Sequence, residues 1–313
     1  MEDVLVIGGG PAGAACALWS HQLGMKTVLL EKNAAMGGQG LQRRTPYTDA
    51  GQPALPGLTG EEVAAQLQAQ LTAAGVACRL GFNVHAVRRE ADTPGWQVSS
   101  TTASLQARYV VIATGAVPRC AAFTEDDHLG TSPGTSMERI NLRGRRVAML
   151  GGGDNAFHQA LFAMGRGAQS VDIYCQGKPR AQMALQMEMP LEQVHIGPYE
   201  VEASRMTVNG IHYDVIGVQY GLQACLPADL QVPLRDGYVD VDRSGSVLGH
   251  DDLFAAGEVT NYWHPCTATA FAHGTQVAKS IQYQHLSLRR AGPAPSVEQV
   301  FAVPTLQQAS MAA

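Results

Sequence analysis

The chain has 313 residues, of which 45% are apolar, and its formal net charge is −5. This length provides one large or two medium domains with a sizeable core, and the acidic balance favours neither nucleic acid nor an anionic membrane as a partner. No apolar run reaches the roughly 18 residues of a membrane span. Because the six cysteines include no CxxC pair and a predicted strand follows Met1 directly, we expect a cytoplasmic protein without a signal peptide.

The start of the chain predicts a strand, a helix and a second strand, over Asp3–Ile7, Pro11–Leu23 and Thr27–Glu31. The glycine turn Gly8–Gly13 joins the first strand to the helix. In such a turn one glycine allows the tight bend, a second lets backbone approach a pyrophosphate, and a third lets the helix pack on the strand. Glu31 ends the second strand, where a carboxylate accepts hydrogen bonds from ribose hydroxyls. The pattern therefore predicts a dinucleotide site.

The next part of the chain predicts one helix and several short strands. After a loop-rich stretch over 32–56, the helix is expected over Glu61–Ala74, with Thr59 at its start. The strands are expected near Ala77–Leu80, Val84–Arg88, Trp96–Ser99 and Ala107–Ala113.

The pattern of strand, glycine turn, helix and strand then occurs a second time. Its parts are expected over Arg146–Leu150, Gly151–Ala156, Asn155–Arg166 and Ser170–Cys175. This self-similarity indicates two nucleotide-binding units rather than a solenoid. Later elements are expected over Val194–Ile196, Arg205–Val208 and Tyr213–Gln219 (strands), Asp251–Glu258 (strand and turn) and Ala268–Gln284 (helix). Residues 291–313 are expected to form a loose tail.

Six motifs, taken together and in this order, resemble the thioredoxin reductase group of two-dinucleotide flavoproteins over about residues 1–285. They are Gly8–Gly13, Glu31-Lys32, Gly37-Gly38-Gln39, Ile112–Ala116, Gly151–Ala156 and Phe254–Val259. The resemblance implies an α/β fold with two doubly wound, Rossmann-like domains. A discontinuous FAD-binding domain would comprise 1–117 and 247–290, and a shortened NAD(P)H-like domain would comprise 118–246. The resemblance also implies a homodimer.

The same resemblance implies FAD in the first site. The Gln39 amide would touch the flavin ring, Val84 backbone the adenine, and Gly257-Glu258 the ribityl chain and pyrophosphate. The full set of implied contacts is Gly8, Gly10, Pro11, Ala12, Gly13, Glu31, Lys32, Gly38, Gln39, Val84, Ala113, Thr114, Gly115, Gly257, Glu258, Thr267 and Ala268. Family members carry Asp at the place of Glu258, so we expect this contact to be rearranged.

The second glycine turn lacks the residues that usually select a pyridine nucleotide. An NAD site needs an acid at the end of the second strand, and an NADP site needs Arg there. The His-Arg-Arg run of the family corresponds to Cys175-Gln176-Gly177, and we expect a hairpin to be missing between this strand and Gly257. Three interpretations remain: NADPH held by Lys178 and Arg180, loosely bound NADH or another adenine compound, or a vestigial site. The residues considered for NAD(P)H are Gly151, Gly153, Asp154, Asn155, Ala156, Lys178 and Arg180.

Thioredoxin reductases pass electrons to a CxxC pair, and the matching stretch 128–140 contains no cysteine. One cysteine still has a possible chemical role, because Cys266 stands at the predicted start of the last helix with His264 nearby. A helix N-terminus and a histidine both lower a thiol pKa, so one interpretation is a thiolate beside the flavin with His264 as acid–base partner. The other interpretation is a small packing residue. We expect no metal site.

These features leave three hypotheses for function. The first is an FAD-dependent oxidoreductase that acts on a small molecule or a small electron carrier without a CxxC relay. The second is an NADPH-dependent reductase of the ferredoxin type. The third is a non-catalytic flavin-binding redox sensor, which the altered second site and the missing dithiol motivate.

Overall fold

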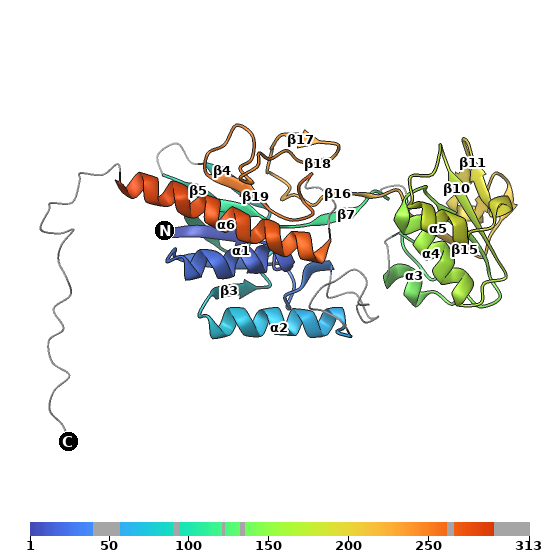
Figure 1. The fold of residues 1–313 in the computed structure, drawn as a ribbon, viewed down its shortest axis with the longest axis horizontal. Coiled ribbons are helices and arrows are strands. Elements are labelled where there is room, and N and C mark those ends of the chain that lie inside the picture. Colours follow the sequence, from blue (N-terminus) through green and yellow to red (C-terminus); the bar gives the residue numbers. More distant parts are fainter. Residues whose placement is uncertain (40–56, 90–93, 121–122, 132–134, 262–265, 291–313) are drawn as a thin grey trace, which may run out of the picture.

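The computed structural model describes residues 1–39, 57–89, 94–120, 123–131, 135–261 and 266–290. Figure 1 shows that they form two bodies, each built around a sheet, joined by the strands β7 (Ala116–Pro118) and β16 (Leu222–Ala224). Within these ranges no helix is both long and apolar enough to cross a lipid bilayer.

The first sheet has the order β3-β2-β1-β6-β5-β4, with β19 beside β6. Its strands are β1 (Glu2–Ile7), β2 (Thr27–Glu31), β3 (Ala77–Leu80), β4 (Ala86–Arg89), β5 (Trp96–Ser99), β6 (Ser104–Ile112) and β19 (Leu253–Ala255). Strands β1, β2, β3, β6 and β19 are parallel, whereas β4 and β5 are antiparallel to their neighbours. Ile7 pairs with Leu30 on one side and Ile112 on the other. The carboxyl ends of the central strands therefore meet at one edge, where the first glycine turn begins.

Alternate residues of β1 point into two cores, as the pleat of a strand requires. Val4 and Val6 belong to a cluster with residues of α1 (Pro11–Gln22) and α6 (Thr267–Arg290). Leu5 and Ile7 belong to the cluster on the opposite face.

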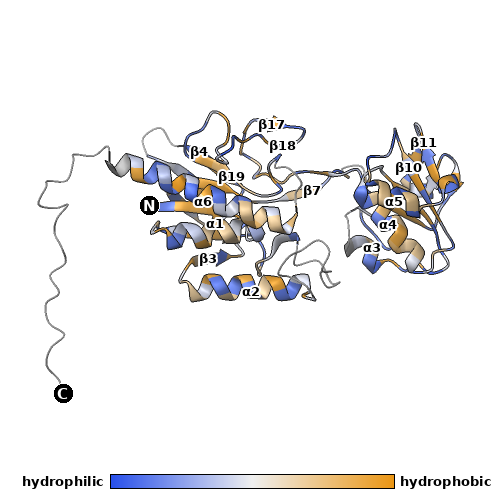
Figure 2. Ribbon diagram, in the orientation of Figure 1, coloured by the Kyte–Doolittle hydropathy of each residue, from blue (hydrophilic) through white to orange (hydrophobic). Residues whose placement is uncertain are grey.

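A third helix, α2 (Gly60–Ala73), lies beyond α1. It begins with a capping box in which the Glu62 N–H donates to Thr59 Oγ1 (3.3 Å) and Glu62 Oε2 accepts from the Thr59 N–H (2.7 Å). The predicted start at Thr59 is confirmed. In Figure 2 this helix alternates between orange and blue, as expected when only one face is buried.

The second sheet has the order β11-β10-β9-β15-β8, and all of its pairs are parallel. Its strands are β8 (Leu129–Gly130), β9 (Arg146–Leu150), β10 (Ser170–Cys175), β11 (Val194–Ile196) and β15 (Val215–Val218), and its helices are α3 (Thr135–Arg139), α4 (Asp154–Gly165) and α5 (Met183–Glu188). Leu150 pairs with Tyr174 as Ile7 pairs with Leu30. The two βαβ units therefore have the same register at the carboxyl edge.

The expected loss of a hairpin between β10 and Gly257, relative to the family, stays a prediction. An antiparallel sheet of three short strands, β12 (Val201–Glu202), β13 (Thr207–Val208) and β14 (Ile211–His212), follows β11. The strand expected over Arg205–Val208 forms only over its last two residues, as β13. A 3-10 turn over Ala203–Arg205 precedes β13, and Met206 between them has a φ of 54°, a left-handed conformation that interrupts a strand.

The stretch after β16 packs with the first sheet. It carries the hairpin β17 (Leu234–Arg235) and β18 (Tyr238–Val239). Leu230 and Val239 are buried in the same cluster as Leu5 and Ile7. The predicted domain boundary at residue 246 stays a prediction, and this packing leads us to propose a return to the first domain near residue 225. The predicted tail over 291–313 lies outside the described residues.

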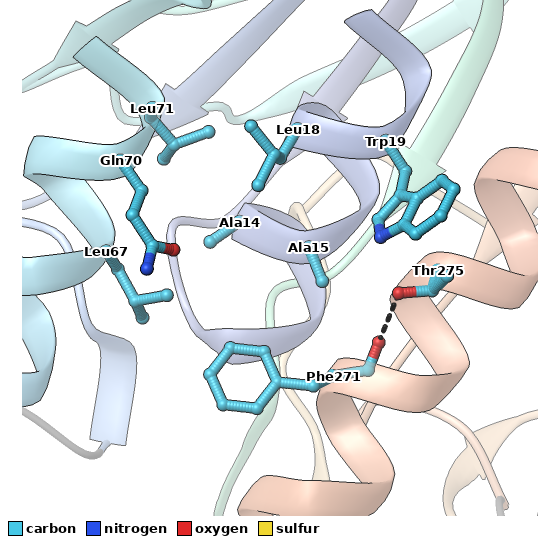
Figure 3. A pocket seen from close by; sticks show the side chains of 9 residues that line it. All are labelled: Ala14, Ala15, Leu18, Trp19, Leu67, Gln70, Leu71, Phe271 and Thr275. Atoms are coloured by element: carbon cyan, nitrogen blue, oxygen red, sulfur yellow. Dashed lines mark hydrogen bonds between the residues drawn. The ribbon is translucent and has the colours of Figure 1, made fainter. Parts of the chain in front are cut away.

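A pocket of about 210 Å³ lies between α1, α2 and α6 on the helix-covered side of the first sheet (Figure 3). Its walls are the side chains of Ala14, Ala15, Leu18, Trp19, Leu67, Gln70, Leu71, Phe271 and Thr275. Thr275 Oγ1 donates to the Phe271 carbonyl (3.0 Å). The lining is mostly apolar, so this pocket has little of the chemistry that binds a charged dinucleotide.

Candidate dinucleotide-binding sites

The first glycine turn exposes backbone at the N-terminus of α1. A methyl group at Gly8, whose φ is 108°, would overlap the Ala113 carbonyl oxygen, and one at Gly13 would overlap the Gly8 carbonyl oxygen. A methyl group at Gly10 would have Gly38 Cα, 3.9 Å away, as its nearest neighbour. Packing therefore requires glycine at positions 8 and 13. Gly10, at the N-cap without a side-chain cap, leaves room for a ligand.

Glu31 is 3% exposed and closes the turn from the β2 side. Its Oε2 accepts from the Gly9 N–H (2.6 Å), and its Oε1 accepts from the Asn33 N–H (2.8 Å). Each carboxylate oxygen has a second lone pair for another donor. The chain then returns to the turn, where the Gly37 N–H donates to the Gly9 carbonyl (2.8 Å). Glu31 is thus held rigidly at the edge where a ribose hydroxyl would bind.

A second turn, after β19, meets the start of α1. Gly257 has a φ of 81°, and a methyl group there would lie 2.6 Å from Ala12 Cβ. Its N–H donates to His273 Nδ1 (3.1 Å). Burial lowers the pKa of His273 to about 4, so at neutral pH the ring is uncharged and Nδ1 is an acceptor. Burial raises the pKa of the next residue, Glu258, although a hydrogen bond from Gln39 acts in the opposite direction.

A buried hydroxyl group at Thr114 shows whether the residues of this cradle fit a bound cofactor. Its Oγ1 is buried and has no hydrogen-bond partner among the residues that the structure describes. A buried hydroxyl without a partner costs free energy, which a ligand with a suitable polar atom would recover. With the open N-terminus of α1 and the carboxylate of Glu31, this hydroxyl gives a residue set that fits the adenosine and pyrophosphate of FAD.

The other residues implied for FAD lie around the same edge. Pro11 is the first residue of α1, Ala113 and Gly115 follow β6, and Thr267 and Ala268 form the first turn of α6.

Two further implied residues lie near the end of β2. Lys32 is exposed directly after this strand. Val84 is half-buried, and its segment is joined to the strand by a bond from the Phe82 N–H to the Glu31 carbonyl (2.9 Å).

The second glycine turn repeats the first in its tight bend. Gly151 has a φ of 137°, and a methyl group there would overlap the Gln219 carbonyl oxygen, whereas Gly153 has open space around it. Gly153 is the N-cap of α4 and has no side-chain cap. Asp154, Asn155 and Ala156 form the first turn of this helix. This N-terminus is therefore also open to a ligand.

Cys175 occupies in the second unit the place that Glu31 has in the first, because each directly follows the last residue paired with the central strand. Its thiol is 1% exposed and donates to the Gly151 carbonyl (3.5 Å). Burial raises the pKa of Cys175, so the group stays neutral. A neutral buried thiol is a weak acceptor for a ribose hydroxyl. The second unit therefore lacks, at this position, the carboxylate acceptor that Glu31 provides in the first unit.

The segment after β10 folds back onto the second turn as the segment after β2 does onto the first. The N–H groups of Arg180 (2.7 Å) and Ala181 (3.1 Å) donate to the Gly152 carbonyl. The Gln182 backbone N–H (2.7 Å) and Nε2 (3.1 Å) donate to the carboxylate of Asp154. These bonds fix the backbone that carries the exposed cations Lys178 and Arg180 beside the glycine turn.

Cys266 precedes the first turn of α6. Its Sγ accepts from the Thr269 N–H (3.5 Å). Burial raises the pKa of this thiol, but hydrogen bonds from the Thr269 hydroxyl and from the Thr269 and Ala268 N–H groups outweigh it, and the net shift is downward. His264, the predicted partner, lies outside the described residues.

The packing of α6 places Cys266 relative to the first cradle. A methyl group at Gly274 would overlap the Ala12 carbonyl oxygen, and Lys279 Nζ lies 4.8 Å from the Trp19 ring centroid. The two helices therefore run in the same direction. Cys266, eight residues before Gly274, is roughly 12 Å further along the helix, beyond the start of α1.

Sequence analysis missed several residues that shape the two sites. They are Asn33, Gln182, His273 and Gly274. The His273-Gly274 pair within a helix that begins with small residues is the local signal that could have indicated two of them. Among the described residues no group of three or more His, Cys, Asp or Glu side chains is arranged to hold a metal ion.

Two sheets with parallel central strands, each with a glycine turn opening a helix at its carboxyl edge, define a protein with two dinucleotide sites. This is the architecture of oxidoreductases that pass electrons between two nucleotide cofactors.

Comparisons with known proteins agree with this class. The pyridine nucleotide-disulphide oxidoreductase family matches residues 2–276. A thioredoxin reductase of Mycolicibacterium smegmatis is 28% identical over 298 residues, which is 88% of this chain and 93% of the relative. A ferredoxin–NADP reductase of Lactococcus lactis subsp. cremoris is 24% identical and covers 90% of this chain and 95% of its own length. The crystal structure of Lactococcus lactis thioredoxin reductase (FR conformation) matches with a TM-score of 0.74 and 23% identity, over 92% of this chain and 100% of that chain.

The chain belongs to the pyridine nucleotide-disulphide oxidoreductase family. It is an FAD-dependent oxidoreductase of the thioredoxin reductase and ferredoxin–NADP reductase type, and its cofactors are FAD and a pyridine nucleotide. The predicted fold, family and enzyme class are confirmed.

Proposed function

We propose that this enzyme takes electrons from NADPH at the second glycine turn and passes them from FAD directly to a small molecule or a small electron carrier. The cofactor supplies the redox chemistry when bound. The chain contributes the cradle at Gly10, the ribose acceptor Glu31 and the Gly257-Glu258 turn. None of the six cysteines forms a CxxC pair, which supports transfer without an internal dithiol relay.

The backbone anchoring of Arg180 at the second turn carries this proposal. The bond from the Arg180 N–H to the Gly152 carbonyl (2.7 Å) fixes the backbone that carries a cation, at the place where Gly37 makes the corresponding bond in the first unit. The absence of an acid at position 175 removes the usual acceptor for the 2′-hydroxyl of NADH. A 2′-phosphate has the complementary charge for Arg180 and Lys178.

The test mixes the FAD-loaded protein with NADPH or NADH under anaerobic conditions and follows loss of the visible flavin absorption. NADPH should bleach the flavin faster than NADH. Because one charged hydrogen bond contributes about 1.5–3 kcal/mol, Arg180→Ala should weaken the apparent NADPH affinity by roughly 10- to 150-fold and leave that for NADH unchanged. Arg205→Ala, at an exposed arginine paired with Glu202, is the matched control. Flavin that neither nucleotide bleaches would contradict the proposal and favour the redox-sensor hypothesis.

The lowered pKa of Cys266 supports a second role at the same flavin. A lower pKa increases the fraction of thiolate, and a thiolate at the start of α6 would be a nucleophile or a charge partner for the reacting centre. Cys266→Ser should change the flavin spectrum or the turnover, whereas Cys78→Ser, at another exposed cysteine, should change neither. An unchanged Cys266→Ser protein would leave packing as its role.

A cytoplasmic homodimer completes the proposal. All six cysteines are free thiols, which fits a reducing compartment. Light scattering coupled to size-exclusion chromatography measures the molar mass of the protein in solution. A monomer at all accessible concentrations would contradict the dimer.

A further inference from the structure

The backbone after β6 shows which position of the first unit is open to a cofactor at the carboxyl edge of the sheet. The Ala113 carbonyl oxygen lies against Gly8, where a methyl group would overlap it. Thr114 comes next, with a buried hydroxyl that has no partner among the described residues. Gly115 follows with a φ of 72°. The residue between Ala113 and Gly115 is therefore the one whose side chain is open to the first cofactor.

The same backbone path occurs after β15 in the second sheet, with Tyr220 at the place of Thr114. A methyl group at Gly151 would overlap the carbonyl oxygen of Gln219, the residue before Tyr220. Gly221, the residue after it, has a φ of 90°. The internal repeat therefore places the half-buried side chain of Tyr220 at the second dinucleotide site.

The hydroxyl group of Tyr220 is held from one side by another tyrosine. Tyr199, in the segment after β11, donates its hydroxyl hydrogen to the Tyr220 oxygen (3.3 Å). Burial raises the pKa of Tyr220, so its hydroxyl keeps its own hydrogen at neutral pH. Because a phenol both donates and accepts, the bond from Tyr199 leaves this hydrogen for a ligand.

The ring of Tyr220 is fixed by its packing. It meets the Phe123 ring edge-on, with 6.0 Å between the two ring centroids. It also packs against the core cluster that contains Val218 and Leu150, the last residue before the second glycine turn. The part of the ring that stays exposed can therefore cover an aromatic group of a ligand, by an offset or edge-on ring contact.

The strand order determines which half of the coenzyme lies beside Tyr220. In the second sheet β9 stands between β10 and β15. The pyrophosphate belongs at the N-terminus of α4, directly after β9, and the adenosine half belongs at the end of β10, where Lys178 and Arg180 lie. The nicotinamide half then extends over the end of β15, from which β16 leads to the first body.

We propose that Tyr220 binds the nicotinamide half of the coenzyme, with its ring as an apolar wall and its hydroxyl as a hydrogen-bond donor, and that Tyr199 is a positioning residue that orients this hydroxyl. The proposal rests on the proposed function, in which the second glycine turn binds NADPH. It gives the second site a contact for the reacting end of the coenzyme, whereas Lys178 and Arg180 act only at the adenosine end.

The test measures the affinity of the FAD-loaded protein for two ligands by isothermal titration calorimetry. NADP⁺ has both halves of the coenzyme, and adenosine 2′,5′-bisphosphate has only the adenosine half; neither reduces the flavin. Because a ring contact and a hydrogen bond each change an affinity by roughly 2- to 10-fold, Tyr220→Ala should weaken NADP⁺ binding roughly 4- to 100-fold and Tyr220→Phe roughly 2- to 10-fold. Both variants should bind adenosine 2′,5′-bisphosphate as the wild type does.

A double-mutant cycle tests the role of Tyr199. Tyr199→Phe removes the bond to the Tyr220 hydroxyl and should also weaken NADP⁺ binding. In a Tyr220→Phe background it should have no further effect, because the hydroxyl through which it acts is gone. A loss of the same size in both backgrounds, or no loss in the single variant, would overturn the positioning role.

Tyr213→Phe is the matched control. Tyr213 packs in the same cluster and shares a bond between hydroxyl groups with Tyr174 (2.8 Å), but it precedes the amino end of β15. Its hydroxyl should matter to neither ligand.

Two results would overturn the proposal for Tyr220. One is equal weakening of both ligands by Tyr220→Phe, and the other is an NADP⁺ affinity that Tyr220→Ala leaves unchanged. Wild-type protein that binds neither ligand would instead refute the proposed function, so the two failures are distinguishable.

Discussion

His273 should make the stability of the first body depend on pH. Its ring is buried and neutral, and Nδ1 accepts from the Gly257 N–H (3.1 Å). Burial lowers the pKa from 6.5 to about 4. Because the folded pKa is below the unfolded one, the unfolded chain takes up a proton first as the pH falls. Stability is therefore lost between about pH 6.5 and about pH 4, and little more is lost below that.

The size of the effect follows from the two pKa values. One pKa unit corresponds to about 1.4 kcal/mol. Between about pH 7 and about pH 5, the difference in proton uptake at His273 amounts to roughly 2 kcal/mol of lost stability. His273→Asn keeps an acceptor near the position of Nδ1 but has no proton to gain. Its missing ring costs stability by the same amount at every pH, so this cost cancels when the two pH values are compared.

The assay is urea unfolding of wild type and His273→Asn at both pH values, followed by tryptophan fluorescence. Trp19 and Trp96 both pack in the first body and report on it. The wild type should lose about 2 kcal/mol more than the variant between about pH 7 and about pH 5. Parallel losses in the two proteins would refute a neutral His273 as the acceptor for Gly257.

Three further predictions concern glycines and the second turn. Gly13→Ala should destabilise the first body, because the methyl group overlaps the Gly8 carbonyl oxygen. Gly10→Ala should instead weaken FAD binding and leave the stability of the apoprotein unchanged. Equilibrium unfolding measures the first effect and flavin titration the second. Gly274→Ala should cost roughly 1–3 kcal/mol by overlap with the Ala12 carbonyl oxygen, while Gly165→Ala, with nothing near it, should stabilise by up to about 1 kcal/mol. Cys175→Glu places an acid where the first unit has Glu31. It should raise the rate of flavin bleaching by NADH relative to the rate by NADPH.

Each of these predictions has an outcome that contradicts it. If Gly10→Ala and Gly13→Ala unfold alike, the cradle is not open at position 10. A stabilised Gly274→Ala protein would mean that α1 and α6 are further apart than the structure has them. If Cys175→Glu leaves the preference between NADH and NADPH unchanged, the end of β10 does not face the adenosine ribose of the coenzyme.

Local sequence patterns predicted the elements that present the sites. Strands β2, β9 and β10 begin and end at the predicted residues, because a buried parallel strand is recognisable as a short, mostly apolar segment. The glycine turns were predictable for a related reason, since Gly8 and Gly151 adopt φ values that other residues avoid.

The bonds that complete the sites were not predictable in this way. His273 and Gly257 are 16 residues apart, and Gln39 and Ala116 are 77 apart. No periodicity links partners at such separations, and each pair exists because the sheet brings its ends together. The return of residues 180–182 onto the second turn was missed for the same reason, since its bonds are made by backbone groups that every residue carries.

Both glycine turns are closed by backbone N–H groups of the segment that follows the next strand. The Gly37 N–H meets the Gly9 carbonyl, and the Arg180 and Ala181 N–H groups meet the Gly152 carbonyl. A graft that moves the segment following Glu31 to the position following Cys175 would therefore meet an acceptor carbonyl at the second turn. The coenzyme preference of such a chimera would show how much of that preference is determined by the short segment and how much by the rest of the domain.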